Sequence, residues 1–259
     1  MAERILEEIP GEIARLKRAP ERLWYRGNPA LLNRPKVSIV GTRRPSPYTR
    51  EMVRTLAREL VRRGVVIVSG AAMGVDSQAH MGAGAAHTIA VVGSGIDIRY
   101  PVTNKSLIES IEREGLVLSR FEPGFRATHW SFVVRNELVV ALGEILIVAE
   151  AEEQSGSMRS AEHALKQGRE IWVLPHRLGE SGGTNRLLRE GLARPIYSIE
   201  AFVERFGRVP TVAEELDEFL LFCQKHPTVD EVVARYGERL YEAELEGKVV
   251  VKNGRVSLA

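Results

Sequence analysis

Loops rich in glycine, hydroxyl and guanidinium groups follow two apolar runs in the first third of this 259-residue chain. The run 37–41 leads into a Thr-Arg-Arg string, and the run 65–70 leads into small residues that end at an aspartate. Glycine lets the backbone approach an anion closely, and arginine can hold a phosphate through two parallel hydrogen bonds. The two loops therefore predict a site for a phosphate-bearing ligand. Its candidate residues are Gly41, Thr42, Arg43, Arg44, Ser69, Gly70, Gly74 and Asp76.

Three further loops of this kind follow later apolar runs, at 93–97, 155–157 and 181–185, and a Phe-x-x-Arg-Asn string lies at 132–136. A loop that opens a helix offers free N–H groups to an anion. Such turns also join strands to helices without binding anything, and Phe132 can equally be a core residue. Five loops at one sheet edge nevertheless favour binding. The added candidates are Phe132, Arg135, Asn136, Ser155, Gly156, Ser157, Gly183 and Thr184.

The elements that would carry these loops alternate between apolar runs and helical periodicity. Residues 48–63 place apolar side chains at i, i+3 and i+4, which predicts a helix that ends at Gly64. Strands that are apolar throughout and separated by helices are typical of a parallel sheet covered on both faces. We therefore predict an α/β fold, a doubly wound Rossmann-like sheet. Its strands are expected at 37–41, 65–70, 88–93, 116–119, 145–150, 170–175 and 195–198.

The common phosphate-binding cofactors do not fit the loop spacing. A G-x-G-x-x-G string after the first strand and a G-x-x-x-x-G-K-[ST] string are both missing, so neither a dinucleotide nor a nucleoside triphosphate is expected. The six histidines are scattered, no Cys/His cluster has metal-site spacing, and Cys223 is the single cysteine. Asp76 and Glu150 are the remaining candidates for a catalytic carboxylate pair, although an aspartate near a helix start ordinarily caps it. We expect no cofactor, no metal and no disulfide.

Charge divides unevenly along the chain. Residues 1–208 carry 30 Lys/Arg against 24 Asp/Glu, whereas residues 209–259 carry six against ten. A basic body suits a polyanionic partner, although so small an excess is also common in proteins that bind none. The first ten residues carry charges where a signal peptide needs an apolar stretch, and no apolar run approaches the ~20 residues of a membrane span. We expect a cytoplasmic protein with no membrane partner.

The composition changes suggest four segments. We predict a lead-in at 1–34 that packs on the main domain, with a short helix around 12–18, then the Rossmann-like domain at 35–206 and a linker at 207–214. Residues 215–259 read as three short helices and a hairpin turning at Asn253-Gly254, which is typical of a small winged-helix domain. Its would-be recognition helix has one arginine against four glutamates, so an interaction module is favoured over duplex DNA recognition.

Taken together, the loops resemble the DprA/Smf family of DNA-processing proteins. The similarity runs in order through about residues 20–206. The strings that carry it are GTRRPSPY (41–48), SGAAMGVDSQAH (69–80), TIAVVGSGIDIRYPVTN (88–104), GLVLSRF (115–121), FVVRNELVVALG (132–143), IVAEAEEQSGSMRSAEHALKQGREIWVLP (147–175) and GGTNRLLREGLA (182–193).

This resemblance implies an extended Rossmann-like domain that forms a homodimer, with a positive pocket for single-stranded DNA and no catalytic turnover. It also implies a protein that protects incoming single-stranded DNA and loads the recombinase RecA during natural transformation. Gly41, Thr42 and Arg43 match the family's first phosphate loop, and Phe132, Arg135 and Asn136 match the string that lines its pocket. A stacked aromatic ring and phosphate-binding arginines would make the binding tolerant of base sequence.

Two positions depart from the family strings. Glu137 stands where the family commonly continues Arg-Asn with a second arginine, and Arg120 stands where it commonly has glutamate after serine. The first change removes a positive charge near the predicted pocket. Two alternatives remain open: a phosphoribohydrolase related to lysine-decarboxylase-like proteins, whose P-G-G-x-G-T-x-x-E string is not matched at 182–185, and a regulator that uses the winged helix on duplex DNA.

Overall fold

The protein is described here from a computed structural model of the chain, which describes residues 4–207, 218–220, 222–223, 226–245, 247–252 and 254–258. The chain divides into two compact units, Met1–Gly207 and Arg208–Ala259. In the described part, no helix is both long and apolar enough to cross a bilayer. Each unit is described by itself below.

A nine-stranded sheet forms the centre of the first unit, with the strand order β1-β2-β6-β5-β4-β3-β7-β8-β9. From β6 through β9 in this order every neighbouring pair is parallel. The chain runs outward from β3 to β6 on one side and from β7 to β9 on the other, so β3 and β7 form a topological switch point. The strands are β1 Arg4–Ile5, β2 Trp24–Gly27, β3 Lys36–Val40, β4 Val66–Ser69, β5 Thr88–Val91, β6 Leu116–Ser119, β7 Ile145–Val148, β8 Glu170–Val173 and β9 Arg194–Pro195.

The apolar runs form strands because both faces of the sheet are covered. Every residue of β3, β4, β5, β6 and β7 is buried, as the runs without alternation predict. The doubly wound α/β prediction is therefore confirmed. The last strand is shorter than expected from 195–198, because only Arg194 and Pro195 pair with β8 and Ser198 already caps the next helix.

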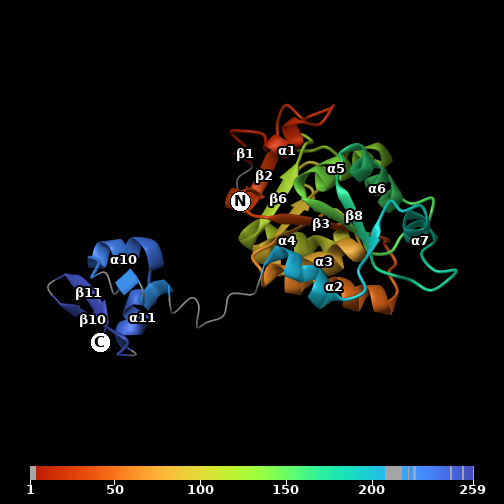
Figure 1. The fold of residues 1–259 in the computed structure, drawn as a ribbon. Coiled ribbons are helices and arrows are strands. Elements are labelled where there is room, and N and C mark those ends of the chain that lie inside the picture. Colours follow the sequence, from red (N-terminus) through yellow and green to blue (C-terminus); the bar gives the residue numbers. More distant parts are fainter. Residues whose placement is uncertain are drawn as a thin grey trace. The chain divides into compact units, whose positions relative to one another are not determined.

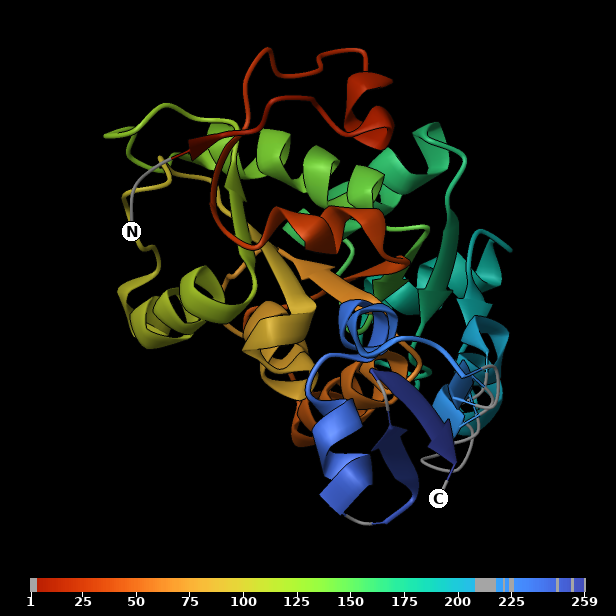
Figure 2. The same ribbon diagram turned by 90° about the vertical axis from the view of Figure 1, so that its left-hand side faces the viewer.

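Helices cover the sheet in two layers (Figures 1 and 2). The layer of α1, α5 and α6 packs on one face against side chains of β3–β8, whereas α2, α3 and α8 pack on the opposite face. The predicted helix at 48–63 is α2. The helices are α1 Gly11–Ala14, α2 Pro47–Val61, α3 Val75–Ala83, α4 Lys105–Glu114, α5 His129–Leu142, α6 Gly156–Lys166, α7 Gly182–Arg189 and α8 Ile199–Val203, with 3-10 turns at Pro29–Asn33, Ala85–His87, Val102–Asn104 and Glu204–Phe206.

The N-terminal segment does more than pack on the domain. It supplies β1 and β2, and β2 pairs antiparallel with β6, so the segment extends the sheet at that edge. The expected helix near 12–18 is the single turn α1, whose Ile13 is fully buried. This edge of the sheet is mixed rather than purely parallel.

The second unit contains α10 Val229–Tyr236, α11 Arg239–Leu245 and the antiparallel pair β10 Val249–Lys252 and β11 Arg255–Leu258. Thr228 and Glu231 form the capping box at the start of α10, and Phe219 and Cys223 are buried in a small core. The hairpin and the capped helix are as expected. The linker at 207–214 falls almost wholly outside the described residues, and the winged-helix assignment stays a prediction.

Candidate nucleic-acid interface

A cleft of about 540 Å³ lies at the switch point, beyond the carboxyl ends of β3 and β7. This is where an open parallel sheet ordinarily binds its ligand. We refer to it as the switch-point cleft. Predicted binding residues from three separate loops and α5 line it together: Gly41, Thr42, Arg43, Asp76, Phe132, Arg135, Asn136, Ser155, Gly156 and Ser157.

Backbone hydrogen bonds hold the first loop to the second loop and to the segment after β7. The N–H of Val75 donates to the carbonyl of Thr42 at 3.1 Å, and the N–H of Thr42 donates to the carbonyl of Glu150 at 2.8 Å. Gly74 has φ +81°, and a Cβ there would lie 2.3 Å from the Thr42 carbonyl oxygen. Glycine at position 74 is therefore required for this approach, although its own atoms do not line the cleft.

Positive charge at the cleft comes from two arginines and a helix end. Arg43 and Arg159 line the cleft, both are exposed, and neither makes an ion pair within the described residues. The α6 helix begins at the cleft, where Ser155 caps it by accepting from the N–H of Met158 at 3.3 Å. The remaining free N–H groups of that first turn carry the positive end of the helix dipole. An anion in the cleft would meet all three groups.

Phe132 lies at the wall of the cleft and is only partly buried. The guanidinium carbon of Arg43 lies 5.6 Å from its ring centroid, and the ring of Tyr100 lies 5.8 Å away. Gly93 makes room for the ring, because a Cβ there would lie 2.8 Å from Phe132 Cδ1. The ring is outside the core clusters of the first unit. Of the two readings of this residue, the geometry favours a stacking surface over a core side chain.

We expect Phe132→Ala to weaken binding of single-stranded DNA by about 1–3 kcal/mol, the usual value of one base stacked on an aromatic ring, with little change in melting temperature. Phe202→Ala is the matched control, since Phe202 is 4% exposed in the opposite helix layer and its loss should cost about 3–5 kcal/mol of stability. Calorimetric melting and fluorescence-anisotropy titration measure the two quantities. A large melting loss in Phe132→Ala would instead make the ring part of the core.

Within the cleft wall, Arg135 is largely buried together with Asp76, at 4% and 7% exposure. One Arg135 nitrogen, Nη1, donates to the carbonyl of Gly70 and, at 2.7 Å, to that of Val91. Burial raises the pKa of Asp76, and the Arg135 charge opposes that rise. Burial likewise lowers the pKa of Arg135, opposed by Asp76. Arg135 therefore ties α5 to the ends of β4 and β5, and its first role is to position the cleft.

Six of the sixteen predicted residues do not line the cleft. Ser69 is buried and donates to the carbonyl of Ile39 at 2.6 Å, Gly70 is buried beneath Arg135, and Arg44 is exposed beside the cleft. Gly74 acts through the loop approach described above. Gly183 and Thr184 are buried at the start of α7, where Thr184 and Ser181 share a hydrogen bond of 2.6 Å. These two residues pack a helix end, and we leave them out of the site proposed below.

The carboxylate pair considered above does not form. Asp76 faces Arg135, whereas Glu150 accepts hydrogen bonds from the N–H and hydroxyl of Ser46 at 3.0 and 3.1 Å and does not line the cleft. Among the described residues no three His, Cys, Asp or Glu side chains are grouped so as to hold a metal ion. His80 is buried against Thr88, and burial lowers its pKa to about 3, so it stays neutral.

Several cleft residues were missed from the sequence. Arg159 and Ser160 lie on the first turns of α6, just after the predicted Ser155-Gly156-Ser157, and helical spacing from that string could have found them. His129 and Gln154 also line the cleft, and their types gave no signal. Glu137, which was expected near the predicted pocket, is not among the residues that line the switch-point cleft. It faces the other side of α5, together with Arg120.

Comparison with known proteins gives a consistent result. A sequence model of the family described as DNA recombination-mediator protein A matches residues 4–207. The DNA processing protein DprA of Streptococcus pneumoniae strain R6 is 39% identical over 186 residues, covering 70% of this chain and 66% of that protein. DprA of Bacillus subtilis strain 168 is 36% identical over 190 residues, covering 71% and 64%. The chain thus spans slightly under two thirds of the length of these curated relatives.

Two solved structures share the fold. DNA processing protein A of Helicobacter pylori, whose structure was described for its single-stranded DNA binding mode, superposes with a TM-score of 0.77 at 44% identity and covers 78% of this chain and 94% of that one. DprA of Streptococcus pneumoniae superposes with a TM-score of 0.73 at 35% identity, covering 80% and 75%. The match to a family of recombination mediators agrees with the expectation that the protein has no enzymatic turnover. With its switch-point cleft and these matches, the chain belongs to the DprA family of DNA-processing, recombination-mediator proteins.

Proposed function

We propose that the switch-point cleft binds single-stranded DNA with little preference for base sequence, and that the protein handles this DNA for recombination. The observation that carries the proposal is the meeting of Arg43, Arg159 and the α6 N-terminus beside the partly exposed Phe132 ring. The cations and N–H groups suit phosphates, which all sequences share. The ring suits the face of any base.

The same arrangement favours a single strand over a duplex. Phe132 can stack only on a base that is not already stacked between neighbours, so a paired strand would have to open first. The H. pylori relative, described for its single-stranded DNA binding, supports this choice of ligand. The phosphoribohydrolase alternative is not favoured, because the family match is to recombination mediators and the Gly-Gly-Thr string at 182–184 packs a helix end.

Three further parts of the proposal rest on the family rather than on the cleft. We propose that the protein acts in the cytoplasm, forms a homodimer through its Rossmann-like domain, and loads RecA onto DNA that it has protected. Size-exclusion light scattering tests the dimer. RecA-dependent strand exchange with and without the protein tests the loading, and an unchanged exchange rate in the presence of bound protein would remove that part.

The central binding test compares matched single- and double-stranded oligonucleotides by fluorescence anisotropy. We expect the single strand to bind at least about tenfold more tightly, a difference of 1.4 kcal/mol. Equal or tighter binding of the duplex would contradict the proposal. Release of free base from a nucleoside monophosphate in proportion to protein concentration would restore the enzymatic alternative.

Truncation after Phe206 is expected to leave single-stranded DNA binding largely intact. The residues that line the switch-point cleft all precede this point, and the removed residues 207–259 carry a net charge of −3 from seven Lys/Arg and ten Asp/Glu. Loss of that charge should tighten binding slightly at low salt and not at high salt, where screening is stronger. The two proteins are titrated at two salt concentrations after their oligomeric states are matched. A loss above about tenfold would place the second unit in the DNA site.

A further inference from the structure

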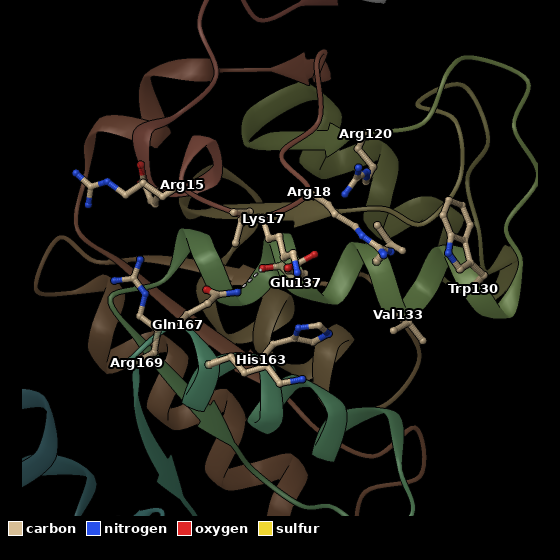
Figure 3. A pocket seen from close by; sticks show the side chains of 14 residues that line it. Arg15, Lys17, Arg18, Arg120, Trp130, Val133, Glu137, His163, Gln167 and Arg169 are labelled. Atoms are coloured by element: carbon tan, nitrogen blue, oxygen red, sulfur yellow. Dashed lines mark hydrogen bonds between the residues drawn. The ribbon is translucent and has the colours of Figure 1, made fainter.

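A second and larger cleft, of about 890 Å³, lies on the other side of α5 from the switch-point cleft. Three parts of the first unit build it: the N-terminal segment, α5 with the loop after β6, and α6. Figure 3 shows Arg15, Lys17 and Arg18 on the N-terminal segment, across α5 from His163 of α6 and from Gln167, which follows α6. We call it the basic cleft. Nothing in the proposed function uses it.

Its lining carries a strong excess of positive charge. Six Lys/Arg line it against two glutamates, and one of those, Glu12, is already paired with Lys36 at 3.2 Å. Arg15, Lys17, Arg18 and Lys166 are exposed and make no ion pair within the described residues. Cations gathered in a recess with so few carboxylates repel one another. An anionic ligand would relieve that repulsion.

Arg120 is the clearest sign of a missing partner. Its side chain lines the cleft, and its Nη1 is buried without a hydrogen-bond partner in the described structure. Burial lowers the pKa of Arg120, while the nearby charge of Glu137 opposes that effect. A buried guanidinium nitrogen without an acceptor is costly, and a phosphate oxygen is an acceptor that fits it. Figure 3 shows Arg18 beside Arg120 at the same end of the cleft.

An aromatic surface lies at that end as well. The Trp130 side chain lines the cleft and is 60% exposed. The ring of Phe121 meets it edge-on, with centroids 5.9 Å apart, and so supports it from behind. The basic cleft thus combines an exposed aromatic ring with arginines, as the switch-point cleft does with Phe132 and Arg43. This combination suits a base and its phosphate better than it suits a purely acidic peptide.

The two clefts are neighbours around the N-terminal end of α5. Val133 lines both of them, and the consecutive residues His129 and Trp130 line the switch-point cleft and the basic cleft respectively. A strand that leaves the first cleft past His129 therefore reaches Trp130 within one turn of helix.

We infer that the basic cleft binds a second segment of the same single-stranded DNA, with a base stacked on Trp130 and phosphates held by Arg18, Arg120 and Lys166. The inference rests on the proposed function, since it extends the path of a strand bound in the switch-point cleft. It assigns the N-terminal segment a role in binding as well as in the sheet. The site would lengthen the bound stretch and raise affinity for long strands.

The test uses the full chain and labelled oligothymidylates of two lengths, about six and about twenty-five nucleotides, spanning the usual size of one binding site. Arg18→Glu/Lys166→Glu is expected to weaken binding of the long strand by more than tenfold and of the short strand by less than threefold. The control is Arg58→Glu/Arg113→Glu, on exposed parts of α2 and α4, which makes the same change in net charge away from both clefts. It should change neither affinity more than threefold.

Tryptophan fluorescence gives a second readout. The long strand should quench the wild-type protein, and Trp130→Phe should remove most of that quenching, because Trp24 is buried and Trp172 lies against Arg205 away from both clefts. Equal losses in the cleft variant and the control, or quenching that persists in Trp130→Phe, would overturn the inference. Quenching by polyglutamate but not by DNA would overturn it in favour of an acidic peptide. If the wild type binds neither oligonucleotide, the proposed function itself fails.

Discussion

Replacing Arg135 with alanine is expected to lower the free energy of unfolding by about 3–5 kcal/mol, the cost of breaking a buried charge pair from one side. The change removes the donor to the carbonyls of Gly70 and Val91 and leaves the buried Asp76 carboxylate without its opposing charge. For a domain of about 200 residues this corresponds to a fall in melting temperature of roughly 6–20 °C. DNA affinity should fall as well, because Arg135 holds the wall of the switch-point cleft in place.

The loss should depend on pH in a defined direction. Burial already raises the pKa of Asp76 above 3.8 in the folded protein, and Arg135 opposes that rise, so the variant should raise the pKa further. A carboxyl whose pKa is higher when folded holds its proton more tightly in the folded state, and stability falls as pH rises from the unfolded value upward. The deficit of Arg135→Ala should therefore be larger at pH 8 than at pH 5.

The control for this prediction is the pair Asp76→Asn and Asp76→Asn/Arg135→Ala, measured with Arg135→Ala in a double-mutant cycle. In the Asp76→Asn background, the loss of stability caused by Arg135→Ala should be the same at pH 5 and pH 8, because no carboxylate remains at position 76 to be protonated. A deficit of the single variant that is the same at both pH values would show that Asp76 is not the group responsible. A deficit below about 1 kcal/mol would contradict the positioning role of Arg135.

Replacing Gly74 with alanine is expected to cost at least about 3 kcal/mol. The left-handed φ of +81° strains any L side chain by about 1–3 kcal/mol, and the new Cβ would lie 2.3 Å from the Thr42 carbonyl oxygen and 2.5 Å from the Arg43 carbonyl carbon. Both contacts are to backbone, so the loop that carries Arg43 must move. DNA binding should fall even at temperatures where the variant is fully folded.

Comparison with Gly84→Ala separates the effect of backbone strain from that of steric contact. Gly84 also has a positive φ, of +76°, but a Cβ there meets no atom within 4 Å, so only the backbone strain of about 1–3 kcal/mol applies. Melting and DNA titration of both variants measure the difference. Equal stability losses, with DNA affinity unchanged in Gly74→Ala, would mean that the approach of the two loops does not shape the cleft.

The parallel part of the sheet was predictable because its strands are buried on both faces and therefore apolar without alternation. The edge was not predictable in the same way. The strand β2 contains Trp24, Tyr25, Arg26 and Gly27, in which burial alternates, and its pairing with β6 is a contact between residues far apart in the sequence. Composition marked the N-terminal segment as different but could not show that it joins the sheet.

For the site, the sequence predicted which residues lie at the cleft better than it predicted what each residue does there. Thr42, Arg43 and Ser155 could be placed at the cleft because parallel strands bring the ends of their loops to one edge. Arg135 is of a residue type that often binds phosphate, but in the fold its side chain is buried. The sequence could not show this, because it does not reveal which way an arginine on a helix faces. The departures Arg120 and Glu137 lie more than fifteen positions apart, and only the packing of the β6 loop against α5 brings them to one cleft.

Titration of a labelled oligothymidylate with Arg43→Ala/Arg159→Ala tests the DNA site most directly. Each arginine is expected to contribute about 1.5–3 kcal/mol as a charged hydrogen-bond donor to phosphate, so affinity should fall at least about 100-fold, with an unchanged melting temperature. The slope of log affinity against log salt should also become shallower by about 1.4, for two lost contacts to a single strand. Arg58→Ala/Arg113→Ala, with the same change in net charge in the opposite helix layer, should retain wild-type affinity within about threefold. Equal affinities for the two double variants would contradict the assignment of the switch-point cleft as the DNA site.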